Sequence, residues 1–379
     1  MDIRIVQRLA DIAPSAWNGL IGTDNPFLRH EFLHALEAHG CARPRNGWQP
    51  FHLLLQQGER LLAAAPAYLK AHSWGEFVFD FSWADAHAQR GLAYYPKLVV
   101  SVPYSPVTGP RVLVAPGESV KEATPPLAQA VRQLVAEHGL SSAHWLFPDD
   151  DLADRLETEG YQRRTGCQFH WENHGYGEFQ DFLAALNSKK RKNVRQERRR
   201  VEEAGIRFVW LHGPEISGAD WLLFERFYRD TFLAHGNVPV LNAGFFRAIG
   251  QGLGDRVLLV LAQHRQETVA GALFLRSADT LYGRYWGSSI DLDGLHFETC
   301  YYQGIEYCIQ HGLRYFEPGA QGEHKVARGF LPKATHSAHW IEDPVLRRAI
   351  GDFLQRERTH ISAYMQDMAG RSPYRQMEV

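Results

Sequence analysis

Hydrophobic and polar positions between residues 296 and 330 predict a helix, a short strand and a glycine-rich loop in direct succession. Apolar residues recur at helical spacing over 297–308, and Gly312 follows, where the end of a helix favours glycine. The pattern at 313–316 indicates a buried strand, which Pro318 prevents from continuing. A loop at the carboxyl end of a strand commonly presents reactive groups, so we expect chemistry here.

The same order of elements occurs earlier in the chain. Residues 130–148 and 304–319 each show an apolar helix, His-Gly-Leu, an aromatic strand and a proline stop. A repeat at this distance suggests two similar halves packed together, with a ligand-binding cleft that they share. The sequence therefore predicts an α/β (α+β) protein with domains at 1–165 and 166–379, the second ending in a closing helix.

A run of positive charge at 189–200 predicts a basic helix, since eight of its twelve residues are Lys or Arg. Arg191, Arg195 and Arg198 fall on one face, where they would form a rail for phosphate groups. The alternative is a solvated helix balanced by neighbouring glutamates, which is the usual role of a charge run. We expect Lys190, Arg191 and Arg195 to contact a ligand.

Composition supports two folded domains and excludes several classes of protein. A chain of 379 residues exceeds one ordinary core, and 45% hydrophobic with 22% charged residues is typical of a folded protein. The formal net charge of −2 gives no overall attraction to nucleic acid or membrane. A site for a polyanion must therefore be local.

The sequence gives no sign of a targeting segment, a membrane span or a metal site. The N-terminus lacks an apolar run long enough for a signal peptide, and no stretch is long enough to cross a membrane. The four cysteines lack CxxC spacing, and the nineteen histidines form no HExxH pattern. We expect a cytoplasmic protein without metal, and the oligomeric state stays open.

Four blocks of sequence stand in a fixed order along the chain. They are YYPKLVVSVPYSPVTGPR at 94–111, LYGRYWG at 281–287, LHFETCYYQGIEY at 295–307 and GAQGEHKVARGF at 319–330. In this order they resemble the FemAB-like family, labelled peptidoglycan biosynthesis/recognition, of the GNAT superfamily. The resemblance implies two tandem GNAT-like halves, each a mixed central sheet flanked by helices, and acyl transfer to an amine. It does not give the substrate.

The resemblance also implies where the chemistry occurs. In a GNAT-like fold the central strand splays open, and its backbone N–H groups stabilise the developing oxyanion. The segment 283–287 corresponds to that strand. The side chains that this places at the site are Arg284, Tyr285 and Trp286.

Amide formation also needs groups that accept and donate protons. Glu298 is one candidate general base, although compensation of helix charge is an equal interpretation. His324 is the alternative base, because its usual pKa lies near physiological pH. Tyr301 or Tyr302 would serve as general acid. The expected binders of phosphate or carboxylate are Arg284, Lys325 and Arg328.

The first half offers further binding candidates. Asp80 and Asp85 flank Trp83, where a substrate amine would be held, although most aromatic residues there are expected in the core. The proline-rich turn that follows contains Tyr104 and ends at Arg111. Arg111 resembles an anion contact, with a structural corner as the alternative.

One departure bears on the acyl donor. Many acetyl-CoA-dependent relatives have a Gln/Arg-x-x-Gly-x-Gly/Ala turn whose amides hold pyrophosphate, whereas this chain has SSIDLDGLHFE at 288–298. We therefore expect no tightly bound cofactor, and either aminoacyl-tRNA or acyl-CoA as co-substrate. The acceptor would be a small amine or a cell-wall precursor, with the acceptor end of tRNA as a candidate partner. The alternatives are an acetyl-CoA-dependent acetyltransferase and a non-catalytic protein that binds an anionic ligand or RNA.

Overall fold

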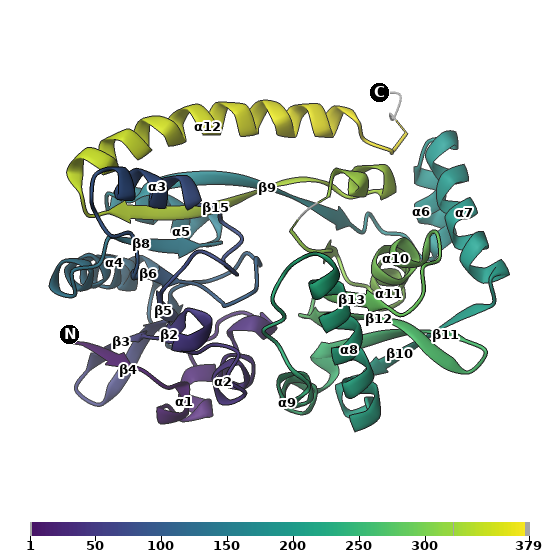
Figure 1. The fold of residues 1–379 in the computed structure, drawn as a ribbon, viewed down its shortest axis with the longest axis horizontal. Helices are drawn as coiled ribbons and strands as arrows, with labels where there is room; N and C mark the ends of the chain where they lie inside the picture. Colours follow the sequence, from purple (N-terminus) through teal and green to yellow (C-terminus); the bar gives the residue numbers. More distant parts are fainter. Residues whose placement is uncertain (1, 321, 376–379) are drawn as a thin grey trace. The chain divides into compact units, whose positions relative to one another are not determined.

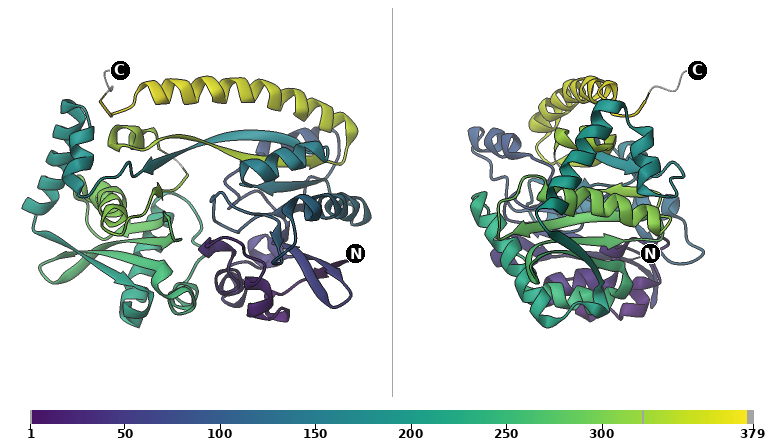
Figure 2. Two further views of the ribbon diagram at one scale, coloured as in Figure 1. Left: turned by 180° about the vertical axis from the view of Figure 1, so that it is seen from behind. Right: turned by 90° about the vertical axis from the view of Figure 1, so that its right-hand side faces the viewer.

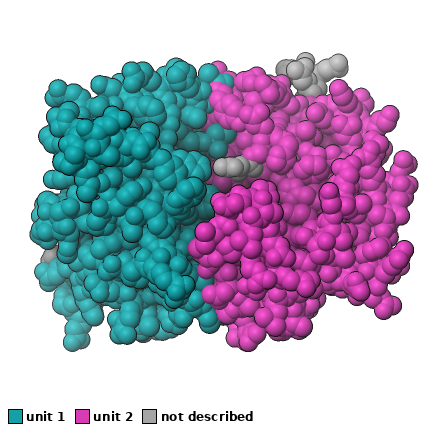
Figure 3. Space-filling model, in the orientation of Figure 1, with its two compact units in different colours: residues 1–167, 334–363 teal, residues 168–333, 364–379 magenta. Residues whose placement is uncertain are grey.

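The computed structural model describes residues 2–320 and 322–375, and it divides into two compact units (Figure 3). Unit 1 comprises residues 1–167 and 334–363, and unit 2 comprises residues 168–333 and 364–379. The predicted boundary after residue 165 lies close to the first of these divisions. Residues 334–363, however, belong to unit 1 and not to the second half.

Three elements run from one unit into the other along the chain. They are β9 (Gln162–Glu172), β15 (Leu331–Ile341) and the long helix α12 (Pro344–Gly370), drawn in yellow in Figure 1. Within unit 1, β15 pairs with β8, and Leu346, Ile350 and Leu354 of α12 pack with Trp83 and Tyr94. Strand pairing and this apolar contact place residues 334–363 in unit 1.

Unit 1 contains two sheets. The sheet β1-β3-β4-β7 is antiparallel, and the strands β15-β8-β6-β5-β2 are antiparallel except for the parallel pair β6 and β8. The strands are β1 (Asp2–Val6), β2 (Trp48–Pro50), β3 (His52–Gln57), β4 (Arg60–Ala65), β5 (Ala67–Lys70), β6 (Lys97–Val100), β7 (Leu113–Val114) and β8 (Ser142–Leu146). The helices are α1 (Pro14–Asn18), α2 (His30–Ala38), α3 (Phe81–Gln89), α4 (Val120–Glu137) and α5 (Asp150–Thr158).

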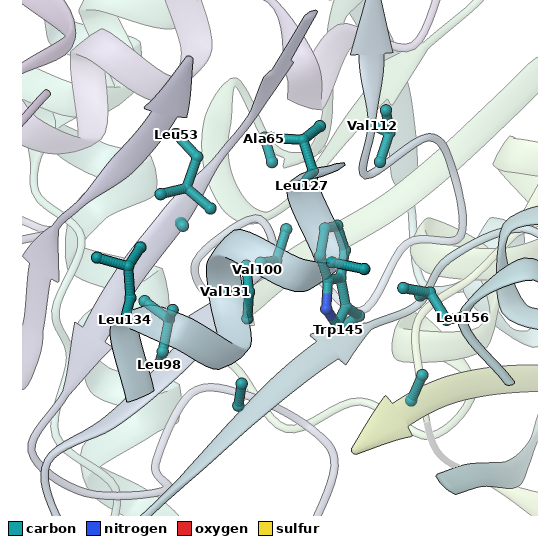
Figure 4. Close-up of a cluster of buried hydrophobic side chains, with 14 of the residues drawn as sticks. Leu53, Ala65, Leu98, Val100, Val112, Leu127, Val131, Leu134, Trp145 and Leu156 are labelled. Atoms are coloured by element: carbon teal, nitrogen blue, oxygen red, sulfur yellow. The ribbon is translucent and has the colours of Figure 1, made fainter. Parts of the chain in front are cut away.

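The core of unit 1 forms around α4 (Figure 4). Leu127, Val131 and Leu134 recur at helical spacing and present one apolar face. They belong to one buried cluster with Val100 of β6 and Trp145 of β8. Burying a side chain of this size stabilises the fold by about 1.5–3 kcal/mol, so this cluster fixes α4 beside the β6–β8 pair.

Unit 2 contains the strand order β10-β11-β12-β13-β14-β9, antiparallel except for the parallel pair β13 and β14. The strands are β10 (Ile206–His212), β11 (Val257–His264), β12 (Glu267–Arg276), β13 (Thr280–Ser288) and β14 (Tyr315–Glu317). The helices are α6 (Phe179–Ala185), α7 (Ser188–Glu203), α8 (Gly218–Ala234), α9 (Ala243–Leu253), α10 (Leu295–Phe297) and α11 (Gln303–Gln310). A π-helix at Glu298–Tyr302 joins α10 to α11.

Helices cover both faces of the unit 2 strands (Figure 2). Tyr285 of β13 packs against Tyr228 of α8, whereas a side chain at Gly304 of α11 would meet Phe316 and Phe274. The two predicted repeat segments occupy equivalent places, because α4 leads to β8, parallel to β6, and α11 leads to β14, parallel to β13. The short 3-10 helices are Leu9–Asp11, Pro26–Leu28, Pro44–Asn46, Gly213–Glu215, Gly254–Arg256 and Glu323–Arg328.

Candidate functional site

β13 and β14 separate in the middle of the unit 2 sheet. They pair over three rungs, the last of which joins Tyr282 to Glu317, and β13 then continues to Ser288. The register between β12 and β13 shifts at Arg284, which is a β-bulge, and Pro318 has no N–H to continue the ladder. We call the gap beyond this rung the strand opening.

A small cavity of about 140 Å³ lies at the strand opening. One wall is the strand segment that begins at Gly283, and Pro318 forms part of the wall opposite. Side chains of the helix that follows β13 complete it. The lining includes Arg284, Tyr285, Trp286, His296, Cys300 and Tyr301. The structure thus brings together four residues predicted for the site.

Tyr301 and His324 form a hydrogen-bonded pair in unit 2. The Tyr301 hydroxyl lies 2.9 Å from His324 Nε2. Tyr301 is buried, and burial raises the pKa of its phenol. His324 is exposed, and partial desolvation followed by the charges of Arg328 and Lys325 lowers the pKa of its imidazole. Both groups are therefore neutral at pH 7, and the neutral imidazole can accept a proton or pass one on.

Lys325 holds the loop that follows β14, beside the strand opening. Its Nζ donates a hydrogen bond of 2.7 Å to the carbonyl of Gly319, and burial lowers the pKa of Lys325 to about 8. Gly319 has φ +100, a backbone conformation that residues with a Cβ rarely adopt. A glycine is thus required where the loop passes β13. The neighbouring Gln321 lies outside the described residues.

Arg328 does not have the role expected of it. Its guanidinium donates 2.7 and 3.2 Å hydrogen bonds to the two carboxylate oxygens of Glu197 and one of 2.9 Å to the His324 carbonyl, and it lies 3.4 Å from the Phe297 ring centroid. The Tyr302 hydroxyl donates to the same Glu197 carboxylate. Arg328 therefore links the loop to α7, and its donors bind groups of unit 2 instead of an anionic ligand.

Glu298 does not share the cavity of Tyr301. Its buried carboxylate accepts hydrogen bonds from Arg198 Nε at 3.1 and 3.2 Å and from Gln303 Nε2 at 2.8 Å. Burial raises the pKa of Glu298, and the Arg198 charge opposes that rise. The residue lines a second cavity, of about 750 Å³, beside β10. Glu298, one of the two candidate bases, therefore lies in a different cavity from Tyr301.

The basic helix forms as predicted, with a different face turned outward. Asn187 caps α7, since its Oδ1 accepts a hydrogen bond of 3.0 Å from the Lys190 backbone N–H. Arg198 turns inward to the Glu298 and Glu306 carboxylates. The outer face forms an open groove of about 710 Å³, the α7 groove. Its lining includes Ser188, Arg191, Lys192, Arg195 and Arg199.

A profile of one family spans this arrangement almost from end to end. The FemAB-like profile, described as peptidoglycan biosynthesis/recognition, matches residues 8–376. The chain belongs to the FemAB-like family. No curated protein matches this FemAB-like chain.

Solved structures show the same fold at low sequence identity. FemX is 11% identical with TM-score 0.55, and the match covers 93% of this chain and 100% of FemX. The C-terminal domain of a putative lysylphosphatidylglycerol synthetase from Agrobacterium fabrum is 10% identical with TM-score 0.56. The match covers 93% of this chain and 96% of that domain. L-PGS from Bacillus licheniformis is 11% identical with TM-score 0.51, and the match covers 88% of this chain and 98% of L-PGS. The FemAB-like chain shares this fold, the mixed α/β fold in two halves that the sequence predicted, and its family membership supports a role in peptidoglycan biosynthesis or recognition.

The amine site expected in the first half of the FemAB-like chain is not formed. Asp80 and Glu76 are buried and accept hydrogen bonds of 2.5 and 2.8 Å from Lys97 Nζ. Trp83 is buried, whereas Asp85 is exposed on α3. Asp80 is therefore occupied by an internal cation, because a buried carboxylate requires one.

Arg111 and Tyr104 stabilise the proline-rich turn instead of binding an anion. Arg111 is 1% exposed. The Tyr104 hydroxyl donates a 3.0 Å hydrogen bond to the Cys41 carbonyl. Because the Arg111 donors have partners within the turn and β8, the expected anion contact is wrong. Arg111 donates to the carbonyls of Val107, Gly109, Pro110 and Leu146.

Two features of the structure were not predicted from the sequence. Glu317, the last residue of β14, is mostly buried, and burial raises its pKa to about 8. In unit 1, the Nδ1 atoms of His144 and His339 lie 2.7 Å apart. A glutamate just before the proline that ends a predicted strand was a signal for Glu317. No sequence signal pairs histidines that are 195 residues apart.

Two further properties of the described residues concern metal binding and the membrane. Within 2–320 and 322–375, no group of three or more His, Cys, Asp or Glu side chains is arranged to hold a metal ion. Every helix in that part of the chain is too short or too polar to span a bilayer.

Proposed function

We propose that this protein transfers an acyl or aminoacyl group to an amine of a peptidoglycan precursor, at the strand opening of unit 2. The observation that carries the proposal is the separation of β13 from β14 beside a small cavity lined by Tyr301. Beyond the Tyr282 rung, the backbone of β13 has no β14 partner among the described residues. Main-chain N–H groups at such a strand opening are suited to bind the oxygen of a carbonyl under attack.

The cavity suits the acyl carbonyl, and the Tyr301–His324 pair suits proton exchange with the reacting groups. A neutral imidazole accepts or relays a proton at physiological pH, and Tyr301 holds its Nε2 in place at 2.9 Å. Lys325 places a further positive charge near the cavity, where charge develops on oxygen. Glu298 is not needed as the base, because Arg198 pairs with its carboxylate.

Two features favour aminoacyl-tRNA over acyl-CoA as the donor. The α7 groove presents Arg191, Lys192, Arg195 and Arg199, which match the phosphates of an RNA end. At the start of the helix after β13, the exposed Asp291 and Asp293 place negative charge where a CoA pyrophosphate would bind. We accordingly expect the reaction in the cytoplasm, where charged tRNA is available.

Incubation with a UDP-linked muramyl pentapeptide, together with charged tRNA or acyl-CoA, tests this function by mass spectrometry. We expect a new amide with charged tRNA, and a rate about 10²–10⁴-fold lower in His324→Ala. His235→Ala is the matched control, because His235 is exposed at the end of α8 and caps that helix. Absence of an amide with both donors would refute the proposal.

The α7 groove also favours a second function, the binding of RNA or another anionic ligand without chemistry. Measurements of tRNA binding and of amide formation distinguish the two functions. Retention of uncharged tRNA by the wild-type protein, with no amide formed from any donor, would select the second function.

A further inference from the structure

Glu317 lies at the base of the strand opening. It forms the last rung of the β13–β14 pair with Tyr282, and the residue after it, Pro318, lines the cavity. A Cβ at Gly283 would lie 3.3 Å from the Pro318 Cα, so the two strands are still close at this point. Glu317 therefore lies at the edge of the opening.

Glu317 faces the side of the sheet opposite the cavity. Phe316 points toward α11, since its ring contacts Phe330 at 5.4 Å between centroids and fills the space beside Gly304. Successive side chains of a strand point to opposite faces, so Glu317 points away from α11. Tyr301 and Cys300, which line the cavity, belong to the π-helix that leads into α11. The opening thus has a cavity on one side and a carboxylate on the other.

This division matches the needs of acyl transfer. A nucleophile attacks a carbonyl carbon from outside the plane of the carbonyl group, so the acyl group and the amine must approach from different sides. With the acyl carbonyl in the cavity, the amine would enter from the Glu317 side. A group that takes the amine proton must lie on that side, where the Tyr301–His324 pair does not.

The surroundings of Glu317 leave its carboxylate available. Its side chain is 15% exposed, and the Nδ1 of His170 lies 4.0 Å from its Oε1. Burial raises the pKa of Glu317 to about 8, Asp279 adds to the rise, and the Arg284 and Lys333 cations oppose it. His170 stays neutral, because burial lowers its pKa to about 3. No residue within 2–320 or 322–375 donates a hydrogen bond to the carboxylate, which is unusual for a group so nearly buried.

We propose that Glu317 is the general base that receives the acceptor amine, an inference that rests on the function proposed above. As the amine nitrogen bonds to the carbonyl carbon, its N–H proton passes to a Glu317 carboxylate oxygen. The bond from that carbon to the ester oxygen of the donor then breaks, and the oxygen leaves with the electron pair. The leaving oxygen takes a proton from the Tyr301–His324 pair, which regains one from solvent, and Glu317 returns its proton to solvent.

The pH dependence of amide formation tests this role in Glu317→Gln and Glu317→Asp. Wild-type kcat/KM should rise with pH and level off above about pH 8, where Glu317 is ionised. Glu317→Gln should be about 10²–10⁴-fold slower and lose this rise, and Glu317→Asp should regain it. Glu172→Gln is the matched control, because Glu172 lies on the neighbouring β9, pairs with Arg314 and should leave the profile unchanged. A Glu317→Gln rate within twofold of wild type, with the same profile, overturns the inference.

A binding measurement keeps the inference separate from the proposed function. Saturation-transfer NMR with glycinamide as the amine probe, and acetamide as its amine-free counterpart, requires no donor. We expect a glycinamide signal in wild type and Glu172→Gln that falls at least tenfold in Glu317→Gln. A signal retained in Glu317→Gln overturns the inference. If wild type forms no amide with any donor while the signal depends on Glu317, the transfer function fails and the amine site stands.

Discussion

At the residue scale, partners decide what a charged side chain does. Arg111 and Arg328 were both expected to bind anions, and in both the guanidinium donates to groups of its own unit. A buried guanidinium needs acceptors for five N–H donors, and the fold supplies carbonyls or a carboxylate for them. The sequence could not show this for Arg328, since the carboxylate that it binds lies on α7, 131 residues away. Trp286 and Tyr301 were predictable, because they stand in the blocks that carry the family resemblance.

Arg111→Lys should destabilise the protein by about 3 kcal/mol, because an ammonium group cannot serve the four carbonyls and stays buried. Urea denaturation of the whole protein, followed by tryptophan fluorescence, measures the change in free energy of unfolding. Arg90→Lys is the control, since Arg90 is 43% exposed and its partner Asp343 lies 3.5 Å away. The prediction fails if the two variants are equally stable.

At the element scale, the sequence predicted the helices and strands better than their orientation. The basic helix and its Asn187 cap were predictable from spacing and local chemistry. Its outer face was not, because Arg198 turns toward Glu298 and Glu306, which are distant in the chain. The π-helix at 298–302 was also not foreseen, since such turns are rare, although they are frequent at functional sites.

Arg195→Glu in the α7 groove should weaken binding of tRNA and lower the slope of log affinity against log salt by roughly 0.7–0.9, because one phosphate contact is lost. Fluorescence anisotropy at several salt concentrations measures both quantities. Arg200→Glu carries the same change of charge outside the groove, where Arg200 pairs with Asp293, and should have a smaller effect. Equal effects of the two variants would show that the groove is not a specific contact.

At the scale of the whole molecule, the two halves and their α/β character were predictable from the internal repeat and the family resemblance. The assignment of residues 334–363 to unit 1 was not, because it depends on pairing of β15 with β8. The cleft expected between the halves stays a prediction. Each unit has its own buried core, and unit 1 also contains a buried polar network whose titration affects stability.

The fold should lose stability below about pH 6.5. Burial, and then the Lys97 charge, lowers the pKa of His144 to about 3, and burial also holds the pKa of His339 far below its usual value. The unfolded chain binds protons at these histidines from about pH 6.5 downward and the folded chain does not, so each contributes a loss of up to about 1.4 kcal/mol per pH unit.

The double variant His144→Gln/His339→Gln should lose less stability than wild type between pH 6.5 and 5 in urea denaturation. The titratable and charged groups that act on the pair are Lys97, Asp80, His87 and Arg164. Glu76, whose pKa burial raises to about 7, acts in the opposite sense in both proteins, so the comparison isolates the histidines. His138→Gln, an exposed change, should follow wild type. Parallel pH curves for the double variant and wild type would contradict this account.

The separation of β13 from β14 is produced by a bulge and a proline, both of which are properties of the main chain. Exchanges of the lining side chains other than Pro318, such as Trp286 and His296, would leave the gap itself in place. We therefore expect such exchanges to change the size and polarity of the group that the cavity accepts without closing the strand opening.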